Sequence, residues 1–272
     1  MKIKLPKIVK VSIIFLFERF GYKNISKDGI ITTLNNIIFT KVGREGGLTR
    51  EKWVEETIKK IPPGSKILDA GAGELKYKKF CSHLKYTSQD FGGYDGIGTG
   101  EGVQIGTWDN SRLDIVSDIT KIPVPDKSFD IILCTEVFEH IPEPALAVKE
   151  FSRIVHPGGK VIITAPFCSL NHFAPFYFAN GYSKYWYEKI LVEYGFNIEE
   201  IFFNGNFFEY MGQEIRNIRE RALKYSKIDT KWWIFFRLAE IVMLQALSRL
   251  SRKDKGSQEL LCFGLHVIAR KK

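Results

Sequence analysis

The chain has 272 residues, 44% of them hydrophobic, a size that suits one α/β domain with additions or two small domains. Its formal net charge of +9 is unevenly placed: residues 1–47 carry a net charge of +6, residues 48–214 of −6, and residues 215–272 of +9. The four cysteines lack the spacing of a disulfide framework or a metal site, which favours a reducing compartment. The basic ends either aid solubility or face an anionic partner, a membrane surface or a nucleic acid.

The first segment of the chain is basic and contains an apolar run at residues 11–17, which is too short to span a bilayer. No small-residue cleavage site follows this run, so the pattern does not predict a signal peptide. We therefore expect residues 1–47 to form a basic amphipathic segment that lies on a surface.

The first predicted strand, residues 67–69, leads into a glycine-rich turn. Gly71 and Gly73 follow the strand, and residues 75–83 predict an amphipathic helix. A strand that ends in Gly-x-Gly and opens a helix is typical of the nucleotide-binding turn of a doubly wound sheet. Glycine at this turn allows the backbone to approach a ligand closely. Glu74 adds negative charge at the turn, which suits a cationic ligand.

Acidic residues follow the next two predicted strands. Residues 85–89 form a strand that ends at Asp90, near the spacing of roughly 20 residues expected for an acid that binds a ribose. The glycine-rich residues 91–110 predict a long loop, and Asp118 follows a third strand at residues 113–116. The remaining predicted elements are strands at residues 131–135, 160–165, 196–203 and 261–269, and helices at residues 48–61, 145–155, 182–194 and 232–250.

Three spaced motifs lie in this region: Asp69-x-Gly71-x-Gly73, the Pro-Val-Pro-Asp-Lys-Ser-Phe-Asp approach to the fourth strand, and the Pro-Gly-Gly turn before the fifth. They resemble the motifs of class I S-adenosylmethionine-dependent methyltransferases with a type 11 methyltransferase domain, including members from bacterial surface-glycan gene clusters. The resemblance implies an α/β, Rossmann-like, seven-stranded and mostly parallel sheet with an antiparallel last strand and helices on both faces. The methyltransferase domain would then comprise residues 48–204 and 259–272, with a helical insertion at residues 205–258.

The resemblance also implies S-adenosyl-L-methionine as the cofactor. The acid after the second strand would bind the ribose hydroxyls, and the acid after the third would bind the adenine amino group. Such an acidic pocket suits a positively charged ligand that carries hydroxyl groups. The cofactor-binding residues that the resemblance implies are Asp69, Gly71, Gly73, Glu74, Asp90, Phe91, Asp118, Ile119 and Glu136.

Two histidines are candidate catalytic residues for removing a proton from an oxygen acceptor: His140 after the fourth strand and His172 after the fifth. Glu136, Glu139 and His140 also have the ExxEH spacing found in ubiquinone-pathway and small-RNA 2′-O-methyltransferases. There this spacing can hold a divalent metal together with a further histidine, for which His172 is the candidate. We expect the histidines to act without a metal, and a divalent metal stays open as the alternative.

The expected function is O-methylation of a glycan, a lipid-linked sugar or another small-molecule acceptor, in the cytoplasm or peripherally at the inner face of the membrane. Alternatives are a quinone-type or RNA O-methyltransferase and a non-catalytic scaffold recruited to a membrane. Nucleic acid is disfavoured as a partner because the sequence shows no RNA-binding module. It also lacks the Asn/Asp-Pro-Pro-Tyr signature of base methylation after the fourth strand.

The predicted helix at residues 232–250 is strongly apolar but contains four interrupting polar residues. Because charges are costly inside a bilayer, we expect an interfacial helix, or a lid against the N-terminal segment, and not a membrane span. On a helical wheel, Arg237, Glu240, Gln245 and Arg249 lie on the half opposite Trp232, Phe236, Met243 and Leu250.

Overall fold

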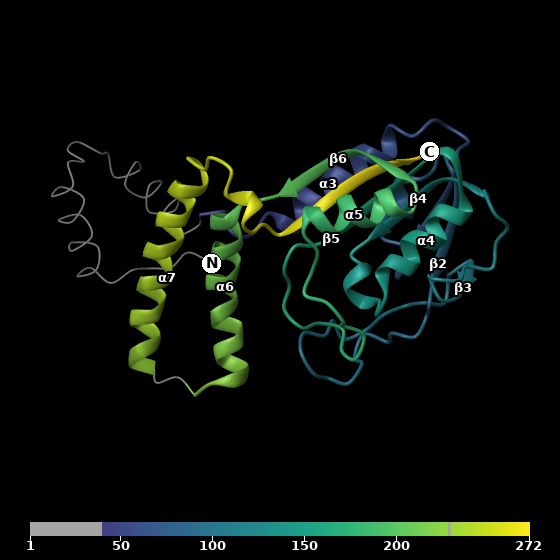
Figure 1. Ribbon diagram of the computed structural model, residues 1–272. Coiled ribbons are helices and arrows are strands. Elements are labelled where there is room, and N and C mark those ends of the chain that lie inside the picture. The colour runs from purple at the N-terminus through teal and green to yellow at the C-terminus, as the bar shows by residue number, and fades with distance from the viewer. Residues whose placement is uncertain (1–39, 228–229) are drawn as a thin grey trace.

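The computed structural model describes residues 40–227 and 230–272, and these residues form one seven-stranded sheet in the order β3-β2-β1-β4-β5-β7-β6 (Figure 1). The strands β1 to β5 pair in parallel, whereas β7 is antiparallel to both of its neighbours. The predicted fold class is therefore confirmed. The strands are β1 (Lys66–Ala70), β2 (Lys85–Asp90), β3 (Ile115–Val116), β4 (Phe129–Thr135), β5 (Val155–Pro166), β6 (Phe196–Asn204) and β7 (Gly264–Lys271).

Helices cover both faces of the sheet (Figure 1). On one face, α3 (Gly46–Lys59) buries Val54 and Ile58 completely. On the other face lie α4 (Pro144–Ile154) and α5 (Lys184–Glu193). Because side chains alternate along a strand, the central strands β1, β4 and β5 contribute to both cores. Ile67, Ile131, Leu133 and Ile162 pack with α3, whereas Leu68, Ile132, Cys134, Val161 and Ile163 pack with α4 and α5.

The expected helix over residues 75–83 is wrong. The segment consists of turns with a single 3₁₀ turn at Lys78–Phe80. Leu75 adopts a left-handed φ of 63°, which is incompatible with a regular right-handed helix. Tyr77 and Cys81 are nevertheless buried in the core beside α3. The apolar spacing in this segment therefore reflects burial and not helicity.

Several strand boundaries also differ from expectation, most of all those of β3, β5 and β7. β5 begins at Val155 because this residue pairs with Phe129, across an irregularity in the register of β4 and β5. β3 is reduced to two residues, and β7 begins at Gly264. Before β7, the backbone of Phe263 bonds to both sides: its N–H donates to the Asn204 carbonyl, and its carbonyl accepts from the Phe167 N–H.

The predicted helical insertion contains two helices, α6 (Phe207–Tyr225) and α7 (Thr230–Ser251), which run antiparallel beside the sheet (Figure 1). Asn206 caps α6, since its side-chain oxygen accepts two backbone N–H groups of the first turn. Leu244 of α7 packs with Ile215 of α6, which joins the two helices.

Most of the predicted N-terminal segment, residues 1–39, lies outside the described residues. Where the described chain begins, Arg216 of α6 donates to the carbonyl oxygens of Thr40 and Val42 at 2.6 and 2.9 Å. None of the helices in the described part of the chain combines the length and the apolar character that crossing a bilayer requires.

Candidate functional site

The turn after β1 depends on two glycines. Gly71 and Gly73 have left-handed φ values of 77° and 49°. A Cβ on Gly71 would lie 2.4 Å from Val137, and a Cβ on Gly73 would lie 2.3 Å from the indole of Trp108. Both positions therefore require glycine for its conformation and for its lack of a side chain. We call the turn formed by residues 71–73 the glycine corner.

Asp90, at the end of β2, contacts the glycine corner directly. Its Oδ2 accepts a hydrogen bond from the Gly73 backbone N–H at 3.1 Å, and its Oδ1 accepts one from Gly92 at 2.9 Å. Each carboxylate oxygen retains a second lone pair that can accept a hydroxyl proton. The neighbouring Phe91 is half-exposed and packs edge-on against Phe176, with 4.9 Å between ring centroids.

Asp69 lies on the buried side of this corner. Only 1% of it is exposed, and its carboxylate accepts a hydrogen bond from the Tyr86 hydroxyl at 2.6 Å. Burial, with a further contribution from Asp90, raises the pKa of Asp69 to about 7. This residue therefore braces the turn from below and offers no surface to a ligand.

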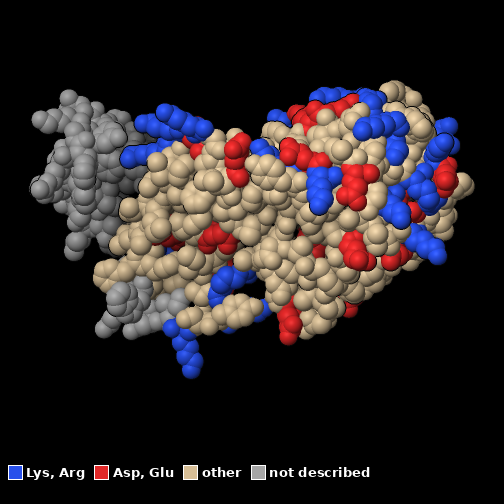
Figure 2. Space-filling model, in the orientation of Figure 1, with Lys and Arg blue, Asp and Glu red and all other residues tan. Residues whose placement is uncertain are grey.

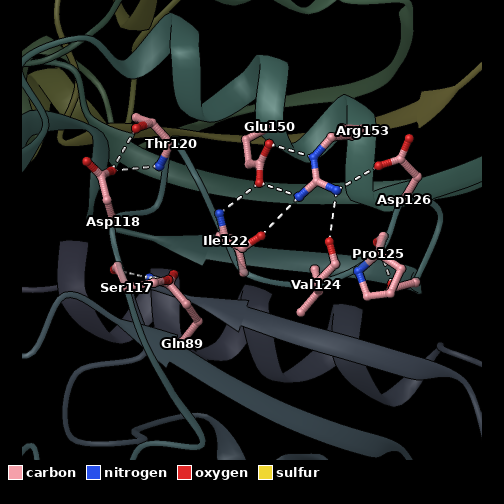
Figure 3. Close-up of polar contacts among 11 residues, drawn as sticks. Gln89, Ser117, Asp118, Thr120, Ile122, Val124, Pro125, Asp126, Glu150 and Arg153 are labelled. Atoms are coloured by element: carbon pink, nitrogen blue, oxygen red, sulfur yellow. Dashed lines mark hydrogen bonds and ion pairs between the residues drawn. The ribbon is translucent and has the colours of Figure 1, made fainter.

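Asp118 and Ile119 follow β3, next to Asp90, because the Ser117 backbone N–H donates to the Asp90 carbonyl at 3.0 Å. The exposed Asp118 carboxylate accepts hydrogen bonds from the backbone N–H and the hydroxyl of Thr120, both at 2.8 Å (Figure 3). The Ile119 side chain is buried in the core with α4 and α5.

A guanidinium holds the segment after Asp118 in place (Figure 3). Arg153 of α4 donates to the carbonyl oxygens of Ile122 and Val124 and pairs with the carboxylates of Glu150 and Asp126. This network fixes the backbone that leads from β3 to β4. It explains how a two-residue strand can still present Asp118 at a defined position.

The glycine-rich loop between β2 and β3 folds over the corner. Glu74 is exposed and accepts a hydrogen bond from the Asp109 backbone at 3.2 Å. Next to it, Trp108 lies against Gly73 and packs edge-on against Tyr94 and Phe173, with 5.7 Å between ring centroids in each case. Trp108 was not among the site residues predicted from the sequence. Its only signal was an aromatic residue in a loop otherwise rich in glycine.

The same loop pairs with the segment that follows β5. Val103 donates its N–H to the Asn171 carbonyl, and Phe173 donates its N–H to the Val103 carbonyl, both at 3.0 Å. Thr99 is bonded in the same way to Ala174. These contacts bring His172 to the edge of the sheet that carries the glycine corner.

Glu136, at the end of β4, is engaged by two partners. Its Oε2 accepts a hydrogen bond from Arg50 at 2.6 Å, and its Oε1 accepts one from the Thr164 hydroxyl at 2.9 Å. The ion pair with Glu136 raises the pKa of Arg50. Glu136 itself has a left-handed φ of 55°, a strained conformation that is common at functional sites. Arg50 lies in α3, and nothing in its sequence context had indicated a role.

His140 and His172 lie side by side, with 4.7 Å between ring centroids. The Nδ1 of His140 contacts the Phe176 carbonyl at 2.5 Å, and the Nδ1 of His172 contacts the Leu170 carbonyl at 2.8 Å. Since a carbonyl oxygen only accepts, each neutral imidazole carries its proton on Nδ1. Each Nε2 therefore presents a lone pair, at 3.7 Å (His140) and 4.0 Å (His172) from Oε1 of Glu139.

Glu139 is fully buried, and neither of its carboxylate oxygens has a hydrogen-bond partner among the described residues. Burial, followed by the charge of Glu136, raises the pKa of Glu139 well above its ordinary value. Burial also lowers the pKa of His140 to about 4. The Glu139 carboxylate and the Nε2 atoms of the two histidines thus lie close together, and a proton or another cation between them would stabilise all three. The ligand atoms of Glu139, His140 and His172 all lie within 4.8 Å of one another.

The structure thus places the predicted residues in three groups. Gly71, Gly73, Glu74 and Asp90 lie at the glycine corner with Phe91 and Asp118 beside it, whereas Asp69 and Ile119 are buried in the interior. Glu136, His140 and His172 gather at the ends of β4 and β5. A separate cavity of about 370 Å³, between α3 and the sheet, is lined by none of these residues.

Comparison with known proteins gives a partial match. Residues 98–163 match a family model described as a methyltransferase domain. The 2-methyl-6-phytyl-1,4-hydroquinone methyltransferase of Synechocystis is 28% identical over 109 residues, which cover 38% of this chain and 32% of that protein. The ubiquinone biosynthesis O-methyltransferase of Coxiella burnetii is 31% identical over 81 residues, which cover 30% of each chain. The chain thus spans about a third of the length of these curated relatives.

Among solved structures, the phosphoethanolamine N-methyltransferase 2 of Haemonchus contortus, in complex with S-adenosyl-L-methionine, gives a TM-score of 0.47 at 16% identity. The superposition covers 92% of this chain and 58% of that one. The matched residues 98–163 run from the glycine-rich loop into β5 and include Asp118, Glu136 and His140. Over residues 98–163 the chain thus matches the methyltransferase-domain family.

Proposed function

We propose that the protein transfers the methyl group of S-adenosyl-L-methionine to an oxygen atom of a small acceptor. The observation that carries the proposal is the contact of Asp90 with the Gly73 backbone, at adjoining ends of parallel strands in a domain of this family. The cofactor supplies an activated methyl group when bound. The protein then has to align cofactor and acceptor and exclude water.

The residues around the glycine corner suit this cofactor. Gly71 and Gly73 have no side chains that would keep a ligand away from the backbone. The free lone pairs of Asp90 can accept hydrogen bonds from the two ribose hydroxyls. Asp118 is exposed beside Asp90 and would face the adenine amino group. Glu74 adds a negative charge near the corner, which favours a cationic sulfonium compound.

The proposal assigns proton removal to the histidine pair. An acceptor hydroxyl would donate its proton to the Nε2 atom of His140 or His172, each of which holds a lone pair there. The Nδ1–H groups are fixed by backbone carbonyls, which orients both rings before the acceptor arrives.

A divalent cation is the second candidate component of this site, favoured by the unpartnered Glu139 carboxylate between the two Nε2 atoms. Two imidazole nitrogens and one carboxylate oxygen are a donor set that transition metals accept. A cation there would stabilise the ionised acceptor hydroxyl. Metal analysis of the purified protein and of Glu139→Gln tests this component, and equal metal content in the two proteins contradicts it.

We further propose that the acceptor is a glycan, a lipid-linked sugar or another small molecule at the inner face of the membrane. The basic ends of the chain support this location. The relatives' names favour a quinone-type phenol as the alternative acceptor. An RNA acceptor and a non-catalytic scaffold are further alternatives.

The deciding experiment compares glycans and lipids from cells with and without the protein by mass spectrometry. We expect one species to be lighter by one CH2 unit when the protein is absent, because its hydroxyl then keeps the hydrogen that a methyl group would replace. In parallel, turnover of the cofactor to S-adenosylhomocysteine is measured with a cell extract as the source of acceptor. No turnover by a protein that binds the cofactor would favour the scaffold, and a change confined to quinones or RNA would favour those acceptors.

A further inference from the structure

The buried acid of α7 lies on the side of the helix that faces α6. Glu240 is only 6% exposed and forms an ion pair with Arg237 one turn away. Leu244, 3% exposed, lies one turn further along the same side and packs with Ile215 of α6. The side of α7 that contacts the rest of the protein therefore carries the ion pair of Glu240 with Arg237.

The opposite side of α7 is apolar and exposed. Leu238, Val242, Met243 and Leu250 are 57%, 68%, 52% and 48% exposed. Ala239 and Ala246 are exposed between them, and the only charged side chain exposed from residue 238 to residue 250 is Arg249, at the end. The spacing places these apolar residues on one side over about 18 Å of helix. We call Leu238, Ala239, Val242, Met243, Ala246 and Leu250 the outer face of α7.

Basic residues lie at both ends of the outer face. In the described part of residues 207–255, seven exposed Lys and Arg residues stand against one exposed acid, Glu220. Figure 2 shows Lys and Arg gathered where α7 ends, beside a surface of α6 and α7 that carries few charges. The exposed basic residues are Arg219, Lys224 and Lys227 near the start of α7, and Arg249, Arg252, Lys253 and Lys255 near its end.

We propose that the outer face of α7 binds an anionic lipid surface, with the helix lying in the plane of the membrane interface. An apolar face bordered by Lys and Arg is what such a surface binds, because the apolar side chains enter the acyl boundary while the cations meet the head groups. A second copy of the chain is the poorer occupant, because symmetric pairing would bring basic ends together. Residues 1–39, which hold seven Lys and Arg against two Asp and Glu, are a poorer occupant for the same reason.

The outer face of α7 is the surface that the proposed membrane location would use, and its assignment rests on that location. Flotation of the full-length protein with phosphatidylcholine vesicles, with and without phosphatidylglycerol, tests it. We expect the protein to float with the anionic vesicles. The double variant Leu238→Asn/Val242→Asn should bind them at least tenfold more weakly. The matched control Leu146→Asn/Val192→Asn removes exposed apolar residues from α4 and α5, and should bind as the unmodified protein does.

A second variant, Arg252→Glu/Lys253→Glu, leaves the apolar face intact and should weaken binding to anionic vesicles. Equal flotation of the outer-face variant and the unmodified protein would overturn the proposal, as would a failure of the unmodified protein to float. A dimer that the outer-face variant dissociates, without vesicle binding, would assign the face to a second copy. Calorimetry with S-adenosyl-L-methionine on the same variants should show unchanged binding, so failure of this inference is distinguishable from failure of the proposed methyl transfer.

Discussion

The Asp90 carboxylate and the Gly73 backbone N–H are 3.1 Å apart, joined across the ends of two neighbouring parallel strands although 17 residues separate them in the sequence. This bond ties the acid proposed to bind the ribose to the turn proposed to face the cofactor. Its position depends on the register of β1 and β2, in which Asp69 lies opposite Ser88 and Ala70 opposite Gln89.

Substitution of Asp90 should weaken cofactor binding more than it weakens the fold. We expect Asp90→Ala to raise the Kd for S-adenosyl-L-methionine at least tenfold, a loss of about 1.4 kcal/mol or more, because two hydroxyl acceptors are removed. Isothermal titration calorimetry measures the change. Glu188→Gln, at an exposed acid of α5, serves as the control and should bind normally. Undiminished binding by Asp90→Ala would refute the proposed role.

Gly73→Ala should destabilise the protein through a specific clash. Its Cβ would lie 2.3 Å from the Trp108 indole, at a φ where a side chain costs about 1–2 kcal/mol. Gly100→Ala is the matched control, since Gly100 also has a positive φ, of 76°, but a Cβ there would meet nothing within 4 Å. Urea unfolding should show a larger loss for Gly73→Ala than for Gly100→Ala. Combining Gly73→Ala with Trp108→Ala should then cost less than the sum of the two single changes.

Removal of Arg50 should leave Glu136 without its main partner. The two side chains are 25% and 28% exposed, so we expect Arg50→Met to lower the free energy of unfolding by about 2 kcal/mol. The control is Lys76→Met, which breaks the more exposed pair with Glu51 and should cost at most about 0.5 kcal/mol. Equal losses of unfolding free energy in the two variants, measured by denaturant unfolding, would show that the pair of Arg50 with Glu136 stabilises the protein no more than an exposed ion pair does.

Parts of this site follow from the sequence, and parts do not. Local spacing was enough to predict the strands, the glycine turn and the acid at the end of β2, since each is set by neighbours in the chain. Arg50 was missed because its partner Glu136 is 86 residues away and no pattern links the two. The failed helix at residues 75–83 depends on the left-handed φ of Leu75, which a leucine gives no reason to expect. For α7, the amphipathic pattern was visible, but the pattern alone does not say which side faces the protein.

Buried histidine should make stability depend on pH. The pKa of His140 is lowered from 6.5 to about 4 by burial, so the unfolded chain binds this proton first as the pH falls. Stability that depends on neutral His140 is therefore present above pH 6.5 and is lost as the pH falls toward 4. Between pH 7 and pH 5, His140 should contribute a loss of about 2 kcal/mol.

The measurement compares urea unfolding of the unmodified protein and His140→Asn at pH 7 and pH 5. The variant should lose less stability over this interval. Three other groups change in the same range: His266, whose pKa burial lowers to about 3, and Asp69 and Glu139, whose raised pKa values act with the opposite sign. All three are present in each protein, so the difference between the two slopes reports His140 together with its contact to Glu139. Identical slopes would contradict the lowered pKa.

The two histidines should be separable by kinetics. If an Nε2 atom accepts the acceptor's proton, its removal should lower kcat by about 100-fold or more while the Kd for S-adenosyl-L-methionine stays unchanged. We expect this result for His140→Asn, for His172→Asn, or for both, once turnover is measured with an acceptor or with cell extract. Tyr177→Phe, beside both rings, is the control for altered packing. If a cation acts instead, chelation should abolish turnover, and Glu139→Gln should lose as much activity as either histidine variant, because all three groups would hold the same ion. Full activity in both histidine variants would remove the pair from the mechanism.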